Sequence, residues 1–374
     1  MARTNKLRIL LINTYPKDKP YSKYEKRLYP GHQLFGALEL KRNDDVEILM
    51  LEQEKYPFIN RIGNWFDITL LDQQIRALFL LRKCDVIYAP YAATNTKLII
   101  LLKLFGIVRK PVVILVHHYL FGEPSQNKLK RLLVKKLIGC YDTIVFLSNT
   151  MKTNLENAYQ FSKAHVSRHF HVFQWGVDAA FFEQYLDVGE PMEKSFIFSS
   201  GNNGRDFDIL LESAKQIKFP FKIYCKPTSF PKAAVIPPNV EILSGDFPFA
   251  QICRDYAAAR ISLVPLAPNP EGITGITSLF ESMALGKPII MTKNENIDID
   301  CEYENIGLTV NENDVDGWVE AISSLLNDHE RLKEMGENSL RLAKEKFNIN
   351  LFAKNLAKAM EDTYQRHADR KSHQ

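Results

Sequence analysis

Residues 272–290 bring together residue types that suit binding of a phosphorylated ligand. The stretch begins with a turn of small residues from Gly275 to Ser278, continues as an apolar run that carries Glu281, and ends in an apolar strand. We expect the turn to open a helix, because amide donors and hydroxyls at a helix N-terminus attract anions. The Glu281 carboxylate would accept hydrogen bonds from sugar hydroxyls. The stretch therefore predicts a site for the diphosphate and ribose of a nucleotide.

A second loop, Gly201-Asn-Asn-Gly204, follows a predicted strand at 195–199. Its glycines allow a tight turn whose backbone comes close to a ligand. Arg205 ends the loop, and a guanidinium can pair with a diphosphate through two parallel hydrogen bonds. We interpret Arg205 as a phosphate-binding group. The alternative is a solvent-exposed arginine at the start of a helix.

Two histidines lie next to the ends of predicted elements. His32 lies in Tyr29–Gly36, a segment that follows the first strand and opens a helix, and His117 ends the strand at 111–116. An imidazole with a pKa near neutrality suits general base catalysis. The alternative for each is a structural role at the end of a helix or strand. His118 would point the opposite way from His117 if strand geometry continues.

Short apolar runs alternate with helix-length segments along the whole chain, which predicts parallel sheets with crossover helices. The predicted strands are 7–13, 46–51, 86–89, 111–116 and 143–147 in the first half, and 195–199, 221–225, 240–243, 261–264, 288–291 and 307–310 in the second. The predicted helices are 73–82, 97–105, 128–138, 206–216, 318–326, 330–346 and 350–367.

The fold class predicted from this pattern is α/β, with two doubly wound Rossmann-like domains facing across a cleft, where such sheets bind ligands. A chain of 374 residues is long enough for two domains. We place an N-terminal domain at 1–185, a C-terminal domain at 186–350, and a last helix at 351–374 that packs back on the first domain. The polar segment 178–193 is the expected linker.

Composition narrows the class of protein. Net charge is +4, a mild excess that does not by itself indicate nucleic acid. The five cysteines stand far apart without a Cys-x-x-Cys pair, which fits a reducing compartment and a cytoplasmic protein. The longest apolar stretch, 98–108, is interrupted by Lys103 and is too short to span a bilayer.

Two basic segments suggest contact with the inner face of a membrane. Residues 1–30 hold eight Lys or Arg against Asp18 and Glu25, and the helix at 128–138 combines leucines on one face with lysines and Arg131 largely on the others. Such a helix can lie on an anionic lipid surface. The alternative is an ordinary sheet-covering helix with a charged outer face.

Three segments in this order resemble the group 1 (family 4) glycosyltransferases, which have the two-domain GT-B fold. They are 173–178 followed by Phe181 and Phe182, the glycine loop and helix at 200–211, and the stretch 272–290. In the first segment Trp175 stands where the family has Asn. The resemblance implies a transferase that moves a sugar from a nucleotide-diphosphate sugar to an acceptor hydroxyl, with retention of configuration and no metal or other cofactor.

The resemblance also implies roles for individual residues. Glu281 matches the second of two family glutamates and would hold the ribose, whereas Ile273 occupies the first position and Glu271 lies two residues too early. His117, His32 and Arg205 are the expected catalytic residues. The expected donor-binding residues are Gly201, Arg205, Phe247, Gly275, Ile276, Thr277, Ser278 and Glu281.

We therefore predict a glycosyltransferase of polysaccharide biosynthesis that binds a nucleotide sugar and a sugar or lipid-linked acceptor, and no nucleic acid. One alternative is a sugar-nucleotide epimerase of the same fold, and another is an inactive nucleotide-sugar-binding subunit. Asp298-Ile-Asp300 matches the metal signature of a different glycosyltransferase fold, but it follows the wrong strand. We expect no metal site.

Overall fold

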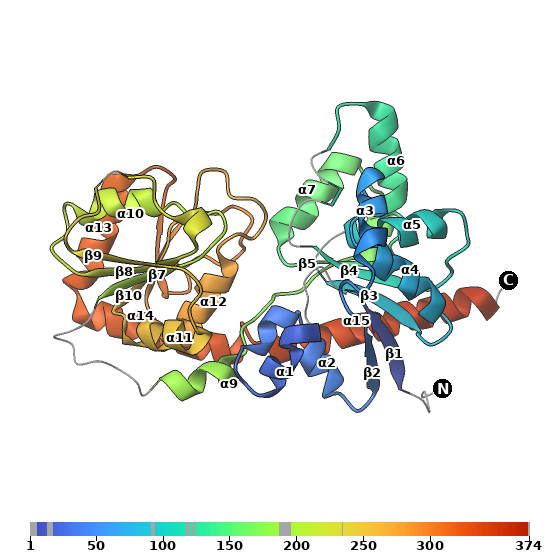
Figure 1. Cartoon of the computed structure of the whole chain (residues 1–374), viewed down its shortest axis with the longest axis horizontal. Helices are drawn as coiled ribbons and strands as arrows, with labels where there is room; N and C mark the ends of the chain where they lie inside the picture. The colour runs from blue at the N-terminus through green and yellow to red at the C-terminus, as the bar shows by residue number, and fades with distance from the viewer. Residues whose placement is uncertain are drawn as a thin grey trace. The chain divides into compact units, whose positions relative to one another are not determined.

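The structure is a computed structural model that describes residues 6–12, 18–90, 94–116, 120–121, 124–186, 196–233 and 235–372. Its contacts divide the chain into two compact units (Figure 1). The first unit comprises residues 1–26, 31–175 and 349–374, and the second comprises 27–30 and 176–348. Whether the predicted limits at 185 and 350 bound independently folding domains stays a prediction.

The first unit is built on a six-stranded parallel sheet with the order β2-β1-β3-β4-β5-β6. The five predicted strands are confirmed, and the short edge strand β6 was not predicted. Its strands are β1 (Leu7–Leu11), β2 (Val46–Met50), β3 (Val86–Pro90), β4 (Val112–Val116), β5 (Thr143–Phe146) and β6 (Phe170–Val172).

Helices cover both faces of this sheet. The chain runs from β1 outward to β2 and then back across β1 to β3, β4 and β5, so right-handed crossovers place the later helices on the face opposite to α2. The helix α15 packs on α2 and β5 (Figure 1). The helices of this unit are α1 (Asp18–Glu25), α2 (Ala37–Lys41), α3 (Pro57–Trp65), α4 (Leu71–Leu80), α5 (Lys97–Leu104), α6 (Lys128–Ile138), α7 (Asn149–Tyr159), α8 (Lys163–His169) and α15 (Ile349–Ser372).

The second unit has a six-stranded parallel sheet with the order β12-β11-β10-β7-β8-β9. All six predicted strands are present, whereas the helix α11 was not predicted. The strands are β7 (Ile197–Ser200), β8 (Phe221–Cys225), β9 (Val240–Ser244), β10 (Ile261–Val264), β11 (Ile289–Thr292) and β12 (Gly307–Val310). The helices are α9 (Ala179–Phe182), α10 (Phe207–Ala214), α11 (Phe249–Ala258), α12 (Ile276–Ala284), α13 (Val315–Leu326) and α14 (His329–Glu345).

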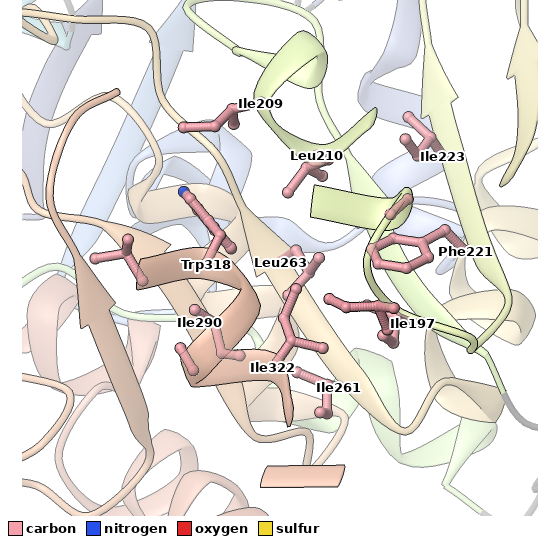
Figure 2. Close-up of a cluster of buried hydrophobic side chains, with 14 of the residues drawn as sticks. Ile197, Ile209, Leu210, Phe221, Ile223, Ile261, Leu263, Ile290, Trp318 and Ile322 are labelled. Carbon is pink, nitrogen blue, oxygen red and sulfur yellow. The ribbon is translucent and has the colours of Figure 1, made fainter. Parts of the chain in front are cut away.

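A continuous apolar core fills the space between this sheet and the helices α10 and α13. Leu210 of α10 and Trp318 and Ile322 of α13 point toward strand residues such as Leu263 (Figure 2). All four side chains are buried. Burial of such residues is the main term that holds the unit together, and it fixes the strand ends from which the loops of the predicted site emerge.

His32 belongs to the core of the first unit. It lies in a short 3-10 helix at Gly31–Leu34, and its side chain is fully buried. The ring meets Trp175 edge-on at 5.8 Å, and Trp175 in turn stacks on Phe35 at 5.0 Å. Burial lowers the pKa of His32 from 6.5 to about 3 because the charged imidazolium would lose its hydration. The ring is therefore neutral at pH 7 and only weakly basic.

This buried histidine should make the fold sensitive to acid. Unfolded His32 takes up a proton below its ordinary pKa of 6.5, whereas folded His32 does so only near 3. Stability should therefore fall as pH drops through that window, by up to about 1.4 kcal/mol per pH unit from this group. We expect His32→Gln to flatten the dependence, measured by urea unfolding from pH 7 to pH 4.5.

Circular dichroism at pH 7 would establish that the His32→Gln variant is folded before the slopes are compared. Parallel stability curves for the two proteins would show that His32 does not carry this acid sensitivity.

Candidate functional site

The predicted donor residues gather at the carboxyl edge of the second sheet. The strand order reverses between β7 and β10, because β8 and β9 lie on one side of this pair and β11 and β12 on the other. Ligands of open α/β sheets bind at such a switch point, outside the carboxyl ends of the strands. The loops that follow β7 and β10 carry Arg205 and the segment before α12, so both lie at this point.

Backbone hydrogen bonds join these two loops. Ala267 N donates to Gly204 O at 3.0 Å, and Asp206 N donates to Pro265 O at 3.3 Å. Arg205 also forms an isolated antiparallel bridge with Leu266. The Asp206 carboxylate then caps α10 by accepting from Ile209 N at 3.2 Å. The position of Arg205 is thus set from both sides rather than by its own loop alone.

Arg205 turns its guanidinium inward, contrary to the alternative of a solvent-exposed arginine. One terminal nitrogen donates to Ser278 Oγ at 2.8 Å, and the other donates to Asn203 O at 3.2 Å. The Nε atom is buried and has no hydrogen-bond partner among the described residues. Burial lowers the pKa of Arg205 to about 10, while the nearby Tyr256 and Glu281 oppose that shift. The group remains cationic at pH 7.

Gly201 makes room for this arginine. A Cβ atom built on Gly201 would come within 2.3 Å of Arg205 Nε, a distance that side-chain carbons do not reach. The backbone of the glycine loop therefore lies directly against the guanidinium. That the glycine loop also lets backbone approach a bound ligand stays a prediction.

The helix α12 begins beside Arg205. Gly275 is its N-cap residue, has a left-handed conformation with φ of 99°, and provides no side-chain cap. Ser278 lies in the first turn and is the hydroxyl that Arg205 contacts. The positive end of the helix dipole and a guanidinium thus point into the same place, an arrangement that favours an anion. Ile276 and Thr277 complete this first turn.

Two sets of polar contacts hold this turn in place, and the sequence did not predict either of them. Asn294, which is buried just after β11, donates through Nδ2 to Gly272 O and to Thr274 O, both at 3.0 Å. Beneath α12, the Tyr256 hydroxyl donates to Ser278 O at 3.1 Å and pairs with Ser282 Oγ at 2.8 Å. A polar residue directly after a buried strand was the available signal for Asn294.

Glu281 is buried in α12, with 7 % of its surface exposed, and it lies close enough to Arg205 to act on its pKa. Nearby lies the position at which the sequence differs from the family pattern, where Ile273 stands in place of the first glutamate. Ile273 is also buried, and Glu271 is exposed. Glu271 helps to form the turn through its backbone oxygen, which accepts from Thr274 Oγ1 at 2.5 Å. The only acidic side chain enclosed in this part of the described structure is therefore that of Glu281.

Phe247 follows β9 at the same carboxyl edge of the sheet. Its ring stands edge-on to Tyr224 at 5.0 Å, and the Tyr224 hydroxyl bonds to Asp255 at 2.5 Å. The half-buried Phe247 ring and the Gly245 backbone lie two strands away from β7. This spacing suits the base end of a nucleotide whose diphosphate lies near Arg205.

Of the predicted catalytic histidines, His32 is enclosed in the first unit. His117 lies outside the described residues. Within the described part of the chain, no group of three or more His, Cys, Asp or Glu side chains is arranged to hold a metal ion. No described helix is both long and apolar enough to cross a membrane.

Comparisons with known proteins indicate what the chain resembles in sequence and in fold. Residues 196–328, which include the whole cluster around Arg205, match the sequence model of a family described as Glycosyl transferases group 1. None of the curated proteins matches the chain.

Three solved structures are similar over nearly the whole chain. A glycosyltransferase from Rickettsia africae is 14% identical with a TM-score of 0.62, covering 96% of this chain and 99% of its own. Sucrose-phosphate synthase from Thermosynechococcus elongatus is 16% identical with a TM-score of 0.64 over 96% and 100%. HepE from Anabaena in complex with UDP-glucose is 15% identical with a TM-score of 0.61 over 95% and 100%. The chain accordingly has the two-domain GT-B fold of these structures, and its residues 196–328 match the group 1 glycosyltransferase family.

Proposed function

We propose that the second unit binds a nucleotide-diphosphate sugar and that the enzyme transfers the sugar to an acceptor hydroxyl. The observation that carries this proposal is the half-buried Arg205 at the switch point, whose guanidinium bonds to Ser278 in the first turn of α12. A buried cation is costly unless it is paired with an anion. A diphosphate supplies the charge and the acceptor oxygens that the terminal nitrogens of Arg205 and the first turn of α12 can meet.

In this assignment the nucleotide lies along the carboxyl edge of the sheet. Arg205, Gly201 and the turn from Gly275 to Ser278 hold the diphosphate, and Glu281 accepts hydrogen bonds from the ribose. Phe247 contacts the base. The HepE structure contains UDP-glucose, so uridine diphosphate sugars are the first donors to test.

Arg205 and α12 would also act in the chemical step. Negative charge grows on the diphosphate as the sugar departs, and positive groups aimed at that charge lower the barrier. Such stabilisation of the leaving group does not need a metal ion. The resemblance supports retention of the anomeric configuration, which proton NMR of the initial product would test.

The first unit would take the acceptor, for which we propose a sugar hydroxyl on a lipid-linked or polysaccharide chain at the cytoplasmic face of the membrane. His117, which follows β4 in the sequence, is the proposed acceptor-side histidine. For His32 to serve as a base, its ring would have to become exposed to solvent, because it is buried and its pKa is about 3.

Purified protein incubated with a panel of nucleotide sugars tests the activity. Nucleotide released only when an acceptor is added supports transfer. Isomerisation of the donor without acceptor would indicate an epimerase, and binding without turnover would indicate an inactive subunit.

Glu281→Ala should weaken binding of the nucleotide sugar, because the ribose hydroxyls lose a charged acceptor. Loss of a hydrogen bond to a charged group costs about 1.5–3 kcal/mol, which corresponds to a tenfold or greater rise in Kd. Isothermal calorimetry would measure this, with Glu320→Ala as a control because Glu320 is an exposed carboxylate on the opposite face of the same unit. Unchanged affinity in a folded Glu281 variant would remove this residue from the site.

Arg205→Ala should reduce turnover more than donor binding, because the contact strengthens as charge develops on the leaving diphosphate. We expect kcat and kcat/KM to fall together, by roughly 100-fold or more if the effect resembles removal of an oxyanion donor. Steady-state kinetics would measure it. A variant that raises KM with kcat intact would mean that Arg205 contributes only to binding of the ground state.

A further inference from the structure

The first unit exposes apolar side chains on the helix layer that covers one face of its sheet. The helices α3, α4, α5 and α6 pack in series, each against the next, and right-handed crossovers place them on the face opposite to α2 and α15 (Figure 1). Every one of these helices, or the residue that follows it, presents a large apolar side chain to solvent. The most exposed are Trp65, Phe79, Phe105 and Leu129.

The orientation of α6 is the clearest sign that this layer has an unusual surface. Leu129, Leu132 and Leu133 form its outward side and are 78%, 51% and 51% exposed, whereas Ile138 is buried. A helix that only covered a sheet would turn its leucine stripe inward. Monomeric proteins rarely expose contiguous apolar surface without using it for an interaction.

The charge of the same helix identifies the kind of partner. The segment from Lys128 to Ile138 contains five basic residues and no acidic one. Lys135 is engaged within the unit, donating to Gln160 O at 2.8 Å and lying over Phe161. Lys128, Lys130 and Lys136 are exposed beside the leucines, so the surface offers apolar groups and positive charge together.

We propose that this layer is a docking surface for an anionic lipid bilayer, in which Leu129, Leu132 and Leu133 enter the acyl boundary while the neighbouring lysines meet lipid phosphates. Amphipathic helices with a leucine face and lysine flanks bind in the interfacial plane, and aromatic rings such as Trp65 favour the same depth. The inference rests on the proposed function, because a lipid-linked acceptor would bring the enzyme to a membrane surface. Binding to lipid is a separate property from transfer.

A second copy of the chain is a weaker fit as the occupant. In a two-fold symmetric dimer the same patch meets itself, so the basic face of α6 would be brought against another basic face. Neither copy brings an acidic residue on this helix to offset the repulsion. A bilayer that contains anionic lipid complements both features of the surface at once.

Vesicle flotation of the full chain, without nucleotide or acceptor, tests the proposal. Phosphatidylglycerol–phosphatidylcholine vesicles should carry the protein upward, pure phosphatidylcholine vesicles much less, and added salt should weaken the binding because exposed charges are screened. The triple variant Leu129→Ser, Leu132→Ser, Leu133→Ser should bind at least about tenfold more weakly, since apolar burial supplies the affinity. Circular dichroism would confirm that it is folded.

A lysine variant and a control variant separate the contribution of charge from that of apolar burial. One variant replaces three lysines with glutamine: Lys128→Gln, Lys130→Gln, Lys136→Gln. Its affinity for anionic vesicles should fall by about fivefold per lysine, and its affinity for neutral vesicles should change little. Tyr303→Ser is the matched control, because Tyr303 is an 85% exposed aromatic residue in the second unit and its loss should leave flotation unchanged.

The outcomes are distinct. Absence of flotation, equal flotation with both kinds of vesicle, or a leucine variant that binds like the unaltered protein would overturn the proposal. Self-association by light scattering that disappears in the leucine variant would assign the surface to a second copy instead. Donor affinity, measured by calorimetry in the same variants, reports separately on the proposed function, so either idea can fail without the other.

Discussion

The second unit is organised around one partly buried cation. Arg205 is half-buried with its Nε atom enclosed, and desolvation lowers its pKa to about 10. Enclosing a cation without full pairing is unfavourable. Ser278, the backbone of Asn203 and the nearby Glu281 offset part of that cost, whereas Nε has no hydrogen-bond partner among the described residues. The glycine loop and the α12 turn, which meet at the switch point of the sheet, supply the contacts that hold this charge in place.

The same constraint explains why so many polar contacts lie beneath α12. Tyr256, which is buried beside the helix, bonds to Ser282 on the helix's buried side, and Asn294 ties the turn before α12 to the end of β11. These residues would touch no ligand, yet they hold the helix N-terminus at a fixed distance from Arg205. A preorganised charge of this kind is effective because little reorganisation is needed when charge develops on the ligand.

The first unit has an apolar residue at a position where the family it resembles has a polar one. Trp175, where the family has Asn, stacks on Phe35 and meets His32. These rings leave His32 neutral and enclosed, so burial and not hydrogen bonding determines its pKa. In contrast, the outer helix layer of this unit leaves Trp65 and Leu129 in solvent. The two units thus share a fold but expose different chemistry.

Periodicity and strand-like runs were enough to predict eleven of the twelve strands, because each is a short apolar segment between helix-length segments. The edge strand β6 was missed because Phe170–Val172 is three residues long and contains a histidine. The spacing of motifs also predicted Arg205, Ser278 and Glu281 as site residues from the sequence. Only the tertiary structure joined Arg205 to Ser278 across 73 positions, recruited Asn294, and turned the leucines of α6 outward. Local pattern sets the period of an element, whereas the direction in which its faces point depends on the elements packed around it.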